Sequence, residues 1–153
     1  MKHAFYDTLN RQAEALLAGE DDMVAAMANF SALLNEHLDS LNWVGFYVRR
    51  EQVLVLGPFQ GKVACTRIPW GKGVCGTAAA TDTTQRIADV HQFDGHIACD
   101  SASNSEIVVP VRRNGEVIAV LDIDSPSFDR FDEADQTGLE ALVRTFEKAL
   151  FGQ

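Results

Sequence analysis

Apolar residues in the first part of the chain recur at steps of three and four, which is the spacing of amphipathic helices. The stripe over residues 4–17 predicts a first helix that ends near Gly19. A second, longer helix follows, and Asp21 or Asp22 can cap its start. The apolar face of this second helix consists of Met23, Ala26, Met27, Phe30, Leu33, Leu34, Leu38 and Leu41. Each helix should therefore bury one face against the rest of the chain.

At Trp43 the period of the apolar positions changes to two, which is the alternation of a β-strand. One face of this strand carries Val44, Phe46 and Val48, and the other carries Trp43, Gly45, Tyr47 and Arg49. Shorter apolar runs predict further strands over residues 53–56, 63–68 and 86–90, the first two stopped by Gly57-Pro58 and by Pro69. Between them, residues 71–76 predict a glycine-rich loop that enters a short helix.

The clearest hairpin in the sequence joins two β-branched apolar runs, residues 107–111 and 117–123. A long loop over residues 91–104 precedes it, and long loops inside compact domains tend to carry function. A last helix should start at Asp132. This order predicts an α+β fold, with an antiparallel sheet of about six strands, helices packed on one face, and the opposite face available for a site. We expect residues 1–153 to form a single domain.

Composition and charge narrow the function. The 153 residues are 46% apolar and 23% charged, which is an ordinary globular composition. Because 22 acidic residues oppose 13 basic ones, for a net charge of −9, neither a nucleic acid nor an anionic membrane is an expected partner. The sequence has no apolar run long enough to cross a bilayer and no signal peptide at its start, so we expect a cytoplasmic protein.

Three cysteines, Cys65, Cys75 and Cys99, match no compact zinc motif and no disulfide framework. Taken singly, each is more readily interpreted as a small buried apolar residue than as a reactive thiol. Cys75, at the predicted start of a helix, is the best candidate for a lowered pKa. His91 and His96 give only a weak indication of metal binding, because no regular element fixes their spacing, and we expect no metal site.

Three carboxylates indicate a functional site more strongly than the cysteines and histidines do. Asp122 and Asp124 lie two apart in an otherwise apolar strand and therefore share one face. The hairpin turn decides whether Glu106 joins them: a two-residue turn pairs Glu106 with Ile123, on the other face, whereas a three-residue turn pairs it with Asp122. We predict the three-residue turn, Arg113-Asn114-Gly115, with Gly115 in the left-handed region.

Such a cluster should hold at least one carboxyl group protonated near neutral pH, because the like charges repel. It is then suited to bind an ammonium group and to protonate an electron-rich oxygen. Trp43 and Tyr47 would offer a wall for a methyl group or a polarised sulfur. The alternatives are a solvated strand end for the aspartates and simple core packing for the two aromatic residues.

Several segments together resemble the free methionine-(R)-sulfoxide reductases, and the resemblance covers nearly the whole chain. The matching segments are residues 42–47 (Asn-Trp-Val-Gly-Phe-Tyr), 57–65, 70–78 (Trp-Gly-Lys-Gly-Val-Cys-Gly-Thr-Ala), 96–100 (His-Ile-Ala-Cys-Asp), 103–110 (Ser-Asn-Ser-Glu-Ile-Val-Val-Pro) and 120–125 (Val-Leu-Asp-Ile-Asp-Ser). That family is built on a GAF domain, an antiparallel sheet flanked by helices, and reduces the R epimer of free methionine sulfoxide.

The resemblance also implies roles for individual residues. Cys99 would be the nucleophile, Cys65 the resolving cysteine and Cys75 an auxiliary thiol. The matching substrate-binding residues are Trp43, Tyr47, Glu106, Asp122 and Asp124, with Glu106 and Asp124 also assigned to proton transfer. Cys99 would be oxidised to a sulfenic acid and then form a redox-active disulfide with Cys65. Thioredoxin, supplied with electrons from NADPH, would reduce this disulfide. Because this reductant is external, no bound cofactor is expected.

The resemblance further suggests a homodimer and a role in the response to oxidative stress. Two alternatives come from a different class of protein. One is a non-catalytic GAF module that senses a small molecule, and the other is a thiol-based redox sensor that uses the same cysteines without turnover. Turnover of free methionine-(R)-sulfoxide separates both from a reductase.

Overall fold

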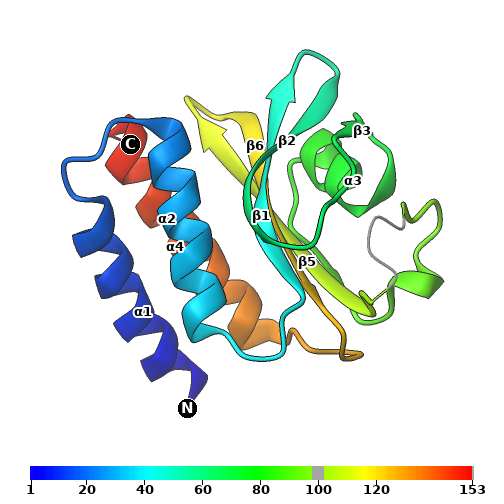
Figure 1. The fold of residues 1–153 in the computed structure, drawn as a ribbon, viewed down its shortest axis with the longest axis horizontal. Coiled ribbons are helices and arrows are strands. Elements are labelled where there is room, and N and C mark those ends of the chain that lie inside the picture. Colours follow the sequence, from blue (N-terminus) through cyan, green and yellow to red (C-terminus); the bar gives the residue numbers. More distant parts are fainter. Residues whose placement is uncertain (98–101, 153) are drawn as a thin grey trace.

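The computed structural model describes residues 1–97 and 102–152. In this part of the chain, six strands form one antiparallel sheet in the order β3-β2-β1-β6-β5-β4 (Figure 1). The strands are β1 (Trp43–Arg50), β2 (Val53–Gly61), β3 (Arg67–Pro69), β4 (Gln85–Ile87), β5 (Ser105–Arg113) and β6 (Glu116–Ser125). The helices are α1 (Lys2–Leu17), α2 (Met23–His37), α3 (Gly73–Thr81) and α4 (Glu133–Phe151), with a short 3₁₀ turn at Val90–Gln92. The predicted α+β class is confirmed.

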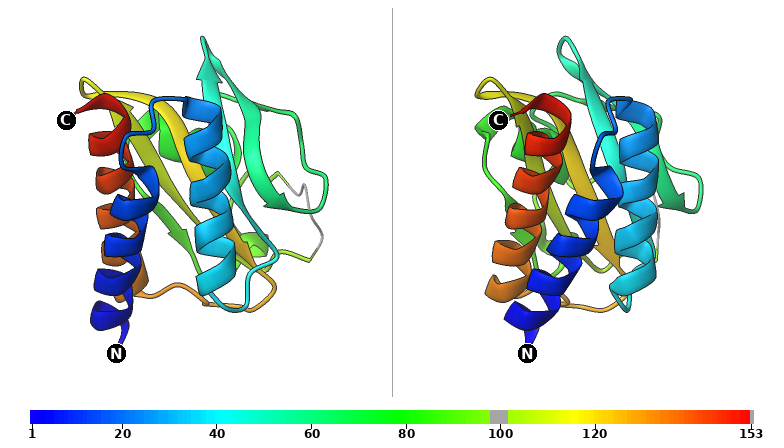
Figure 2. Two further views of the ribbon diagram at one scale, coloured as in Figure 1. Left: turned by 60° about the vertical axis from the view of Figure 1, so that its left-hand side comes forward. Right: turned by 90° about the vertical axis from the view of Figure 1, so that its left-hand side faces the viewer.

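The helices α1, α2 and α4 gather on one side of the sheet (Figure 2). Their starts follow the expected capping chemistry. The side chain of Asp22 accepts a hydrogen bond from the Ala25 N–H at 2.9 Å and caps α2. At α4, the side chains of Asp132 and Asp135 each accept from the backbone N–H of the other, which makes a capping box. The predicted start of the last helix at Asp132 is therefore confirmed.

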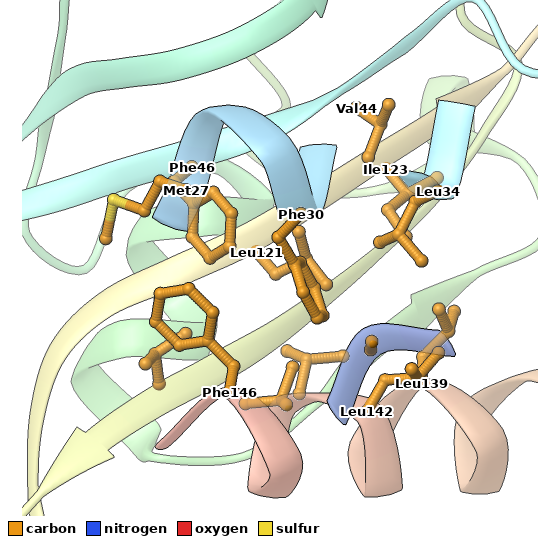
Figure 3. Close-up of a cluster of buried hydrophobic side chains, with 14 of the residues drawn as sticks. Met27, Phe30, Leu34, Val44, Phe46, Leu121, Ile123, Leu139, Leu142 and Phe146 are labelled. Atoms are coloured by element: carbon orange, nitrogen blue, oxygen red, sulfur yellow. The ribbon is translucent and has the colours of Figure 1, made fainter. Parts of the chain in front are cut away.

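The main hydrophobic core lies between this helical layer and the facing side of the sheet (Figure 3). Phe30 of α2, Phe46 of β1 and Phe146 of α4 meet there, with ring centroids between 5.2 and 5.8 Å apart. All three side chains are fully buried, so each contributes about 1.5–3 kcal/mol of hydrophobic stabilisation. The predicted shared face of Val44, Phe46 and Val48 is confirmed, since Val44 and Phe46 belong to this core and the partly buried Val48 packs against it.

The opposite side of the sheet is partly covered rather than free, because α3 packs across β5 and β6 there (Figure 1). A second core results, which includes Val74, Cys75 and Ala78 of α3 together with Trp43 and Tyr47 of β1. The glycine-rich loop that enters a short helix is present at the predicted position. What the sequence pattern does not indicate is that this helix returns onto the sheet and encloses the site.

The predicted ends of three strands are wrong. β2 continues through Gly57-Pro58 to Gly61, because a bulge opposite Phe46 accommodates a proline that has no N–H to donate. β3 is confined to Arg67–Pro69 at the edge of the sheet, and β4 begins and ends earlier than predicted, at Gln85–Ile87. Proline is tolerated at the end of β3 because an edge strand has an unpaired side.

The predicted hairpin between β5 and β6 is present, but the predicted turn is wrong. Arg113 pairs with Glu116, so the turn has two residues, Asn114 and Gly115, both with positive φ (54° and 80°). A bulge then shifts the register, because Val111 pairs with Ala119 and Arg112 with Val117, which leaves Ile118 as the extra residue.

The bulge decides which residues face one another farther along the hairpin. Without it, the two-residue turn would set Glu106 opposite Ile123. With it, Glu106 pairs with Asp124 rather than with Asp122 as predicted. The acidic residues nevertheless share one face, because Asp122 lies two positions from Asp124 on the same strand.

None of the helices among the described residues is both long enough and apolar enough to cross a membrane.

Candidate active site

A pocket lies on the second side of the sheet, between β1, β5 and β6 below it and α3 above it. The residues of this pocket come from five segments that are distant in the sequence. In chain order the segments contribute Trp43 and Tyr47; Ala64 and Ile68; Gly73 to Cys75; His96, Ile97, Ser103 and Glu106; and Asp122 and Asp124. The fold therefore brings the predicted aromatic pair, the predicted carboxylates and Cys75 to one place.

The carboxylates form the floor of the pocket. Glu106, Asp122 and Asp124 are only 6%, 5% and 8% exposed, which is unusual for acidic residues and rules out the solvated strand end as an alternative. Each side chain leaves the sheet on the same face, because Glu106 pairs with Asp124 and Asp122 follows at a spacing of two. The acidic cluster predicted from the sequence is thus present, with a different pairing.

Burial and mutual repulsion favour the protonated forms in this cluster. The pKa of Glu106 is raised well above its usual value, first because the side chain is buried and then because Asp122 and Asp124 lie beside it. Burial also raises the pKa of Asp122, although hydrogen bonds with Glu106, Cys75 and Asp124 act in the opposite direction. These shifts favour an un-ionised Glu106, and a buried carboxylic acid of this kind can act as a general acid.

One oxygen of this cluster is available to accept a hydrogen bond from a ligand. Oδ1 of Asp122 is buried and has no hydrogen-bond partner among the described residues. A buried acceptor without a donor costs about 1–3 kcal/mol, so a bound donor group would be stabilised here. An ammonium group offers three donors and a positive charge, which suits this position.

Cys75 lies against the carboxylates, since its sulfur and oxygens of Glu106 and Asp122 fall within 4.8 Å of one another. The lowered pKa expected for a thiol at a helix start is wrong. Complete burial raises the pKa of Cys75 well above its usual value, and the charges of Asp122, Glu106 and Asp124 raise it further. Cys75 is therefore a neutral thiol, because desolvation and three acidic neighbours outweigh the helix dipole.

Aromatic side chains of β1 and β2, namely Trp43, Tyr47 and Phe59, form an aromatic wall beside the carboxylates. Trp43 stacks on Tyr47 with ring centroids 5.8 Å apart and also on Phe59 at 5.1 Å. A side chain at Gly45, between them on β1, would overlap the Cβ of Phe59, so glycine is required there. Phe59 is not singled out by the sequence pattern, because the predicted strand stops before it.

Two hydrogen bonds fix the rings of this wall. The indole Nε1 of Trp43 donates to the carbonyl of Lys62 at 3.2 Å, and the Tyr47 hydroxyl donates to the carbonyl of Cys65 at 2.8 Å. Both acceptors lie in the segment between β2 and β3. The wall is thus joined directly to the backbone of Cys65, a half-buried residue whose segment does not form the strand that the sequence predicts for it.

The long loop supplies the remaining side of the pocket. Ser103 is buried at the pocket wall, and its hydroxyl accepts a hydrogen bond from the side-chain amide of Asn42 at 3.0 Å. Asn104 next to it bonds His91 at 2.9 Å and the carbonyl of Pro126 at 2.7 Å, which anchors the end of the loop. The sequence pattern does not predict that Ser103 and Asn104 lie beside the pocket, because serine and asparagine are common in polar loops. Cys99, the predicted nucleophile, lies outside the described residues.

His96 also lines the pocket, and burial lowers its pKa, so its ring is neutral at neutral pH. In the part of the chain that the structure describes, the histidines are not in a compact group of metal-ligating side chains; the group that is compact consists of Cys75, Glu106 and Asp122. Within this group the side chain of Asp122 forms hydrogen bonds with Glu106 and Cys75.

Comparisons with known proteins agree with this geometry. The sequence model of the GAF domain family matches residues 20–150. The free methionine-R-sulfoxide reductase of Escherichia coli (strain K12) is 58% identical over 149 residues, which covers 97% of this chain and 90% of that protein.

Solved structures agree as well. A structure described as fRMsr of Staphylococcus aureus in complex with substrate is 55% identical, has a TM-score of 0.91 and covers 95% of each chain. The free methionine-R-sulfoxide reductase from Neisseria meningitidis, solved with its substrate, is 46% identical with a TM-score of 0.93, and the match covers 97% of this chain and 90% of that one.

Proposed function

This chain belongs to the free methionine-R-sulfoxide reductases, a family with a GAF domain, and on that premise we propose how it reduces the R epimer of free methionine sulfoxide. The observation that carries the proposal is the buried cluster of Glu106, Asp122 and Asp124, which faces the stacked rings of Trp43 and Tyr47. The cluster is suited to a ligand that has both an ammonium group and a proton-accepting oxygen, and methionine sulfoxide has both.

Asp122 binds the substrate ammonium in this proposal. Its buried Oδ1 has no donor among the described residues, and the α-ammonium group of a free amino acid supplies one. A methionine sulfoxide residue inside a peptide has an amide in place of that charge. Pairing of the ammonium group in a closed pocket therefore selects the free amino acid, because a site built for a charge rejects a substrate that lacks it.

Glu106 and Asp124 act on the sulfoxide oxygen. The raised pKa of Glu106 keeps its carboxyl group protonated, so it donates a hydrogen bond to the oxygen and transfers the proton as the S–O bond weakens. Asp124, directly opposite Glu106, shares this proton. The methyl group and the polarised sulfur then lie against Trp43 and Tyr47.

The thiolate of Cys99 attacks the sulfoxide sulfur, the oxygen is protonated, and methionine leaves while Cys99 becomes a sulfenic acid. The thiol of Cys65 next attacks the sulfenic sulfur, and water leaves as the disulfide forms. The two thiols thereby supply the two electrons that reduce the sulfoxide. Thioredoxin, through its dithiol, reopens the disulfide by exchange, with NADPH as the final source of electrons. Cys75, a buried neutral thiol, has no part in this exchange and instead contacts Asp122.

The test is an NADPH-coupled assay with thioredoxin and thioredoxin reductase. We expect NADPH to be consumed with free methionine-(R)-sulfoxide, and not with the S epimer or with N-acetylmethionine-(R)-sulfoxide, whose ammonium group is blocked. The N-acetyl compound is the matched control, since it keeps the sulfoxide and the chirality. Binding of the free sulfoxide without NADPH consumption would instead identify a sensing GAF module, and equal rates with the N-acetyl compound would refute the role of Asp122.

A further inference from the structure

We infer that the pocket also binds amino acids that carry a methylated sulfonium group in place of the sulfoxide, with S-methylmethionine as the simplest example, and that such compounds inhibit the enzyme by occupying the substrate site. The inference rests on the proposed function for the orientation of the amino acid. It goes beyond that function, because a sulfonium compound has no oxygen for the reductase to remove.

The charge of the pocket is the first argument. Its described lining includes three carboxylic acids, whereas none of its described residues is Lys or Arg. His96 is the one basic side chain in this lining, and its lowered pKa leaves it neutral. A free amino acid with a neutral side chain brings no net charge to this site. A sulfonium amino acid brings a net positive charge, which the acidic floor attracts.

The buried oxygen of Asp122 is the second argument. Oδ1 lacks a partner among the described residues, in a side chain that is 5% exposed. It accounts for the α-ammonium group, so Glu106 and Asp124, which share one proton in the proposed function, face the far end of the ligand with one negative charge between them. The pocket therefore offers a second negative charge, which a substrate with an uncharged sulfoxide end does not use.

The aromatic wall is the third argument. Trp43 and Tyr47 both line the pocket, and their rings lie within 24° of parallel. A cation within about 6 Å of an aromatic centroid is attracted by the electron-rich face of the ring, and indole is the strongest of the natural partners. In a sulfonium group the positive charge of the sulfur is shared with its methyl groups, and these methyl groups can pack against the aromatic rings.

A sulfonium amino acid has the same geometry at sulfur as methionine sulfoxide, so it can occupy the same site. The sulfur of a sulfoxide carries two carbons and one oxygen in a pyramidal arrangement, and a sulfonium sulfur carries three carbons in the same arrangement. A methyl group thus takes the place of the oxygen. It cannot accept the proton of Glu106, so the gain from charge is partly offset by the loss of one hydrogen bond.

The experiment is isothermal titration calorimetry of the reduced full-length protein with S-methyl-L-methionine and, as matched ligand, with L-methionine. L-Methionine has the same ammonium, carboxylate and chain but an uncharged sulfur. We expect S-methyl-L-methionine to bind about tenfold more tightly, and to raise the apparent KM for methionine-(R)-sulfoxide without changing kcat.

Two tryptophans supply the matched variants. Trp43→Leu should reduce the tenfold preference to about twofold or less, because the wall is lost. Trp70→Leu should retain the preference, since Trp70 packs under Arg49 outside the pocket lining. If Trp43→Leu does not fold, Asp124→Asn keeps the volume of the side chain, removes one acidic group and should also lower the preference.

The outcomes separate the two proposals. Equal dissociation constants for S-methylmethionine and methionine would overturn the sulfonium inference, and an unchanged reductase activity in the same preparation would leave the proposed function standing. A preference that survives in both Trp43→Leu and Asp124→Asn would place the sulfonium elsewhere and would also overturn the inference. Tight sulfonium binding in a protein that reduces no sulfoxide would refute the proposed function alone.

Discussion

Glu106 on β5 lies directly opposite Asp124 on β6, and Asp122 lies opposite Val108. Glu106 therefore has an aspartate across the strand pair and a second one diagonally beside it. This position between two acidic neighbours adds to burial in raising the pKa of Glu106. Of the three carboxyl groups, Glu106 is thus the one best placed to hold a proton at neutral pH and to release it during catalysis.

Replacing that proton donor tests the acid step. We expect Glu106→Gln to lower kcat by about 100-fold or more, because glutamine keeps the size and a hydrogen-bond donor but cannot transfer a proton. The coupled assay with free methionine-(R)-sulfoxide measures the effect. Glu116→Gln, at the exposed start of β6, is the control and should retain the wild-type rate. A Glu106→Gln enzyme with the wild-type kcat would exclude Glu106 as the acid.

Asp122 has a different expected effect, because we assign it to the substrate ammonium. Asp122→Asn should raise KM for the free amino acid by about 10-fold to 100-fold, with a smaller change in kcat, since a hydrogen bond to a charged group contributes about 1.5–3 kcal/mol. Steady-state kinetics over a range of sulfoxide concentrations separates the two parameters. Asp7→Asn, on the exposed side of α1, is the matched control. An unchanged KM in Asp122→Asn would contradict the assignment.

The stability of the folded protein should fall as the pH rises from about pH 5 to about pH 8, because the unfolded chain releases the Glu106 proton in this range while the folded protein retains it. A carboxyl group whose pKa is raised on folding stabilises the fold most below its usual value near 4.5, and this contribution is lost as the pH rises through the folded pKa. Glu106→Gln should therefore lose less stability than the wild type over this range, as measured by urea unfolding at both pH values.

Acidic groups whose pKa is lowered on folding do not interfere with this measurement. The pKa of Asp132 is lowered to about 2, first by the backbone N–H of Asp135 and then by Lys2. The stability that Asp132 contributes is present above its usual value of 3.8 and is lost only as the pH falls from there toward 2. A parallel decline of wild type and Glu106→Gln between about pH 5 and pH 8 would show that Glu106 is ionised in the folded protein.

Serine substitutions distinguish the cysteines. We expect Cys99→Ser to abolish turnover, and Cys65→Ser to release about one methionine per chain and then stop, because the sulfenic acid has no resolving thiol. Cys75→Ser should continue to turn over with thioredoxin, since a buried neutral thiol is a poor nucleophile. Released methionine is counted by mass spectrometry with and without thioredoxin. A Cys75→Ser protein that stops after one turnover would identify Cys75 as a resolving thiol.

The elements that could be predicted are those whose sequence signal is local. The capping residues of α2 and α4 and the alternation along β1 are properties of a few neighbouring residues, and the structure confirms each of them. The aromatic pair followed from the alternation along β1, and the shared face of Asp122 and Asp124 followed from the same period along β6, whereas the place of Glu106 depended on the turn and the bulge. Family resemblance added roles for the cysteines, which spacing alone did not distinguish.

The features that could not be predicted depend on contacts between distant segments. The run Val117 to Leu121 is apolar throughout, so nothing in it marks Ile118 as the extra residue of a bulge. The return of α3 onto the sheet buries Cys75 and reverses the direction expected for its pKa. Such burial is decided by packing between elements, and no local pattern reports it.

The bulge at Ile118 also limits how this hairpin can vary in length. Insertion or deletion of a single residue between the turn and the bulge would exchange the two faces of β5, which would send Glu106 among the phenylalanines and bring Ile107 to the pocket. Length changes in functional relatives should therefore occur by two residues at a time, or should be accompanied by loss or relocation of the bulge.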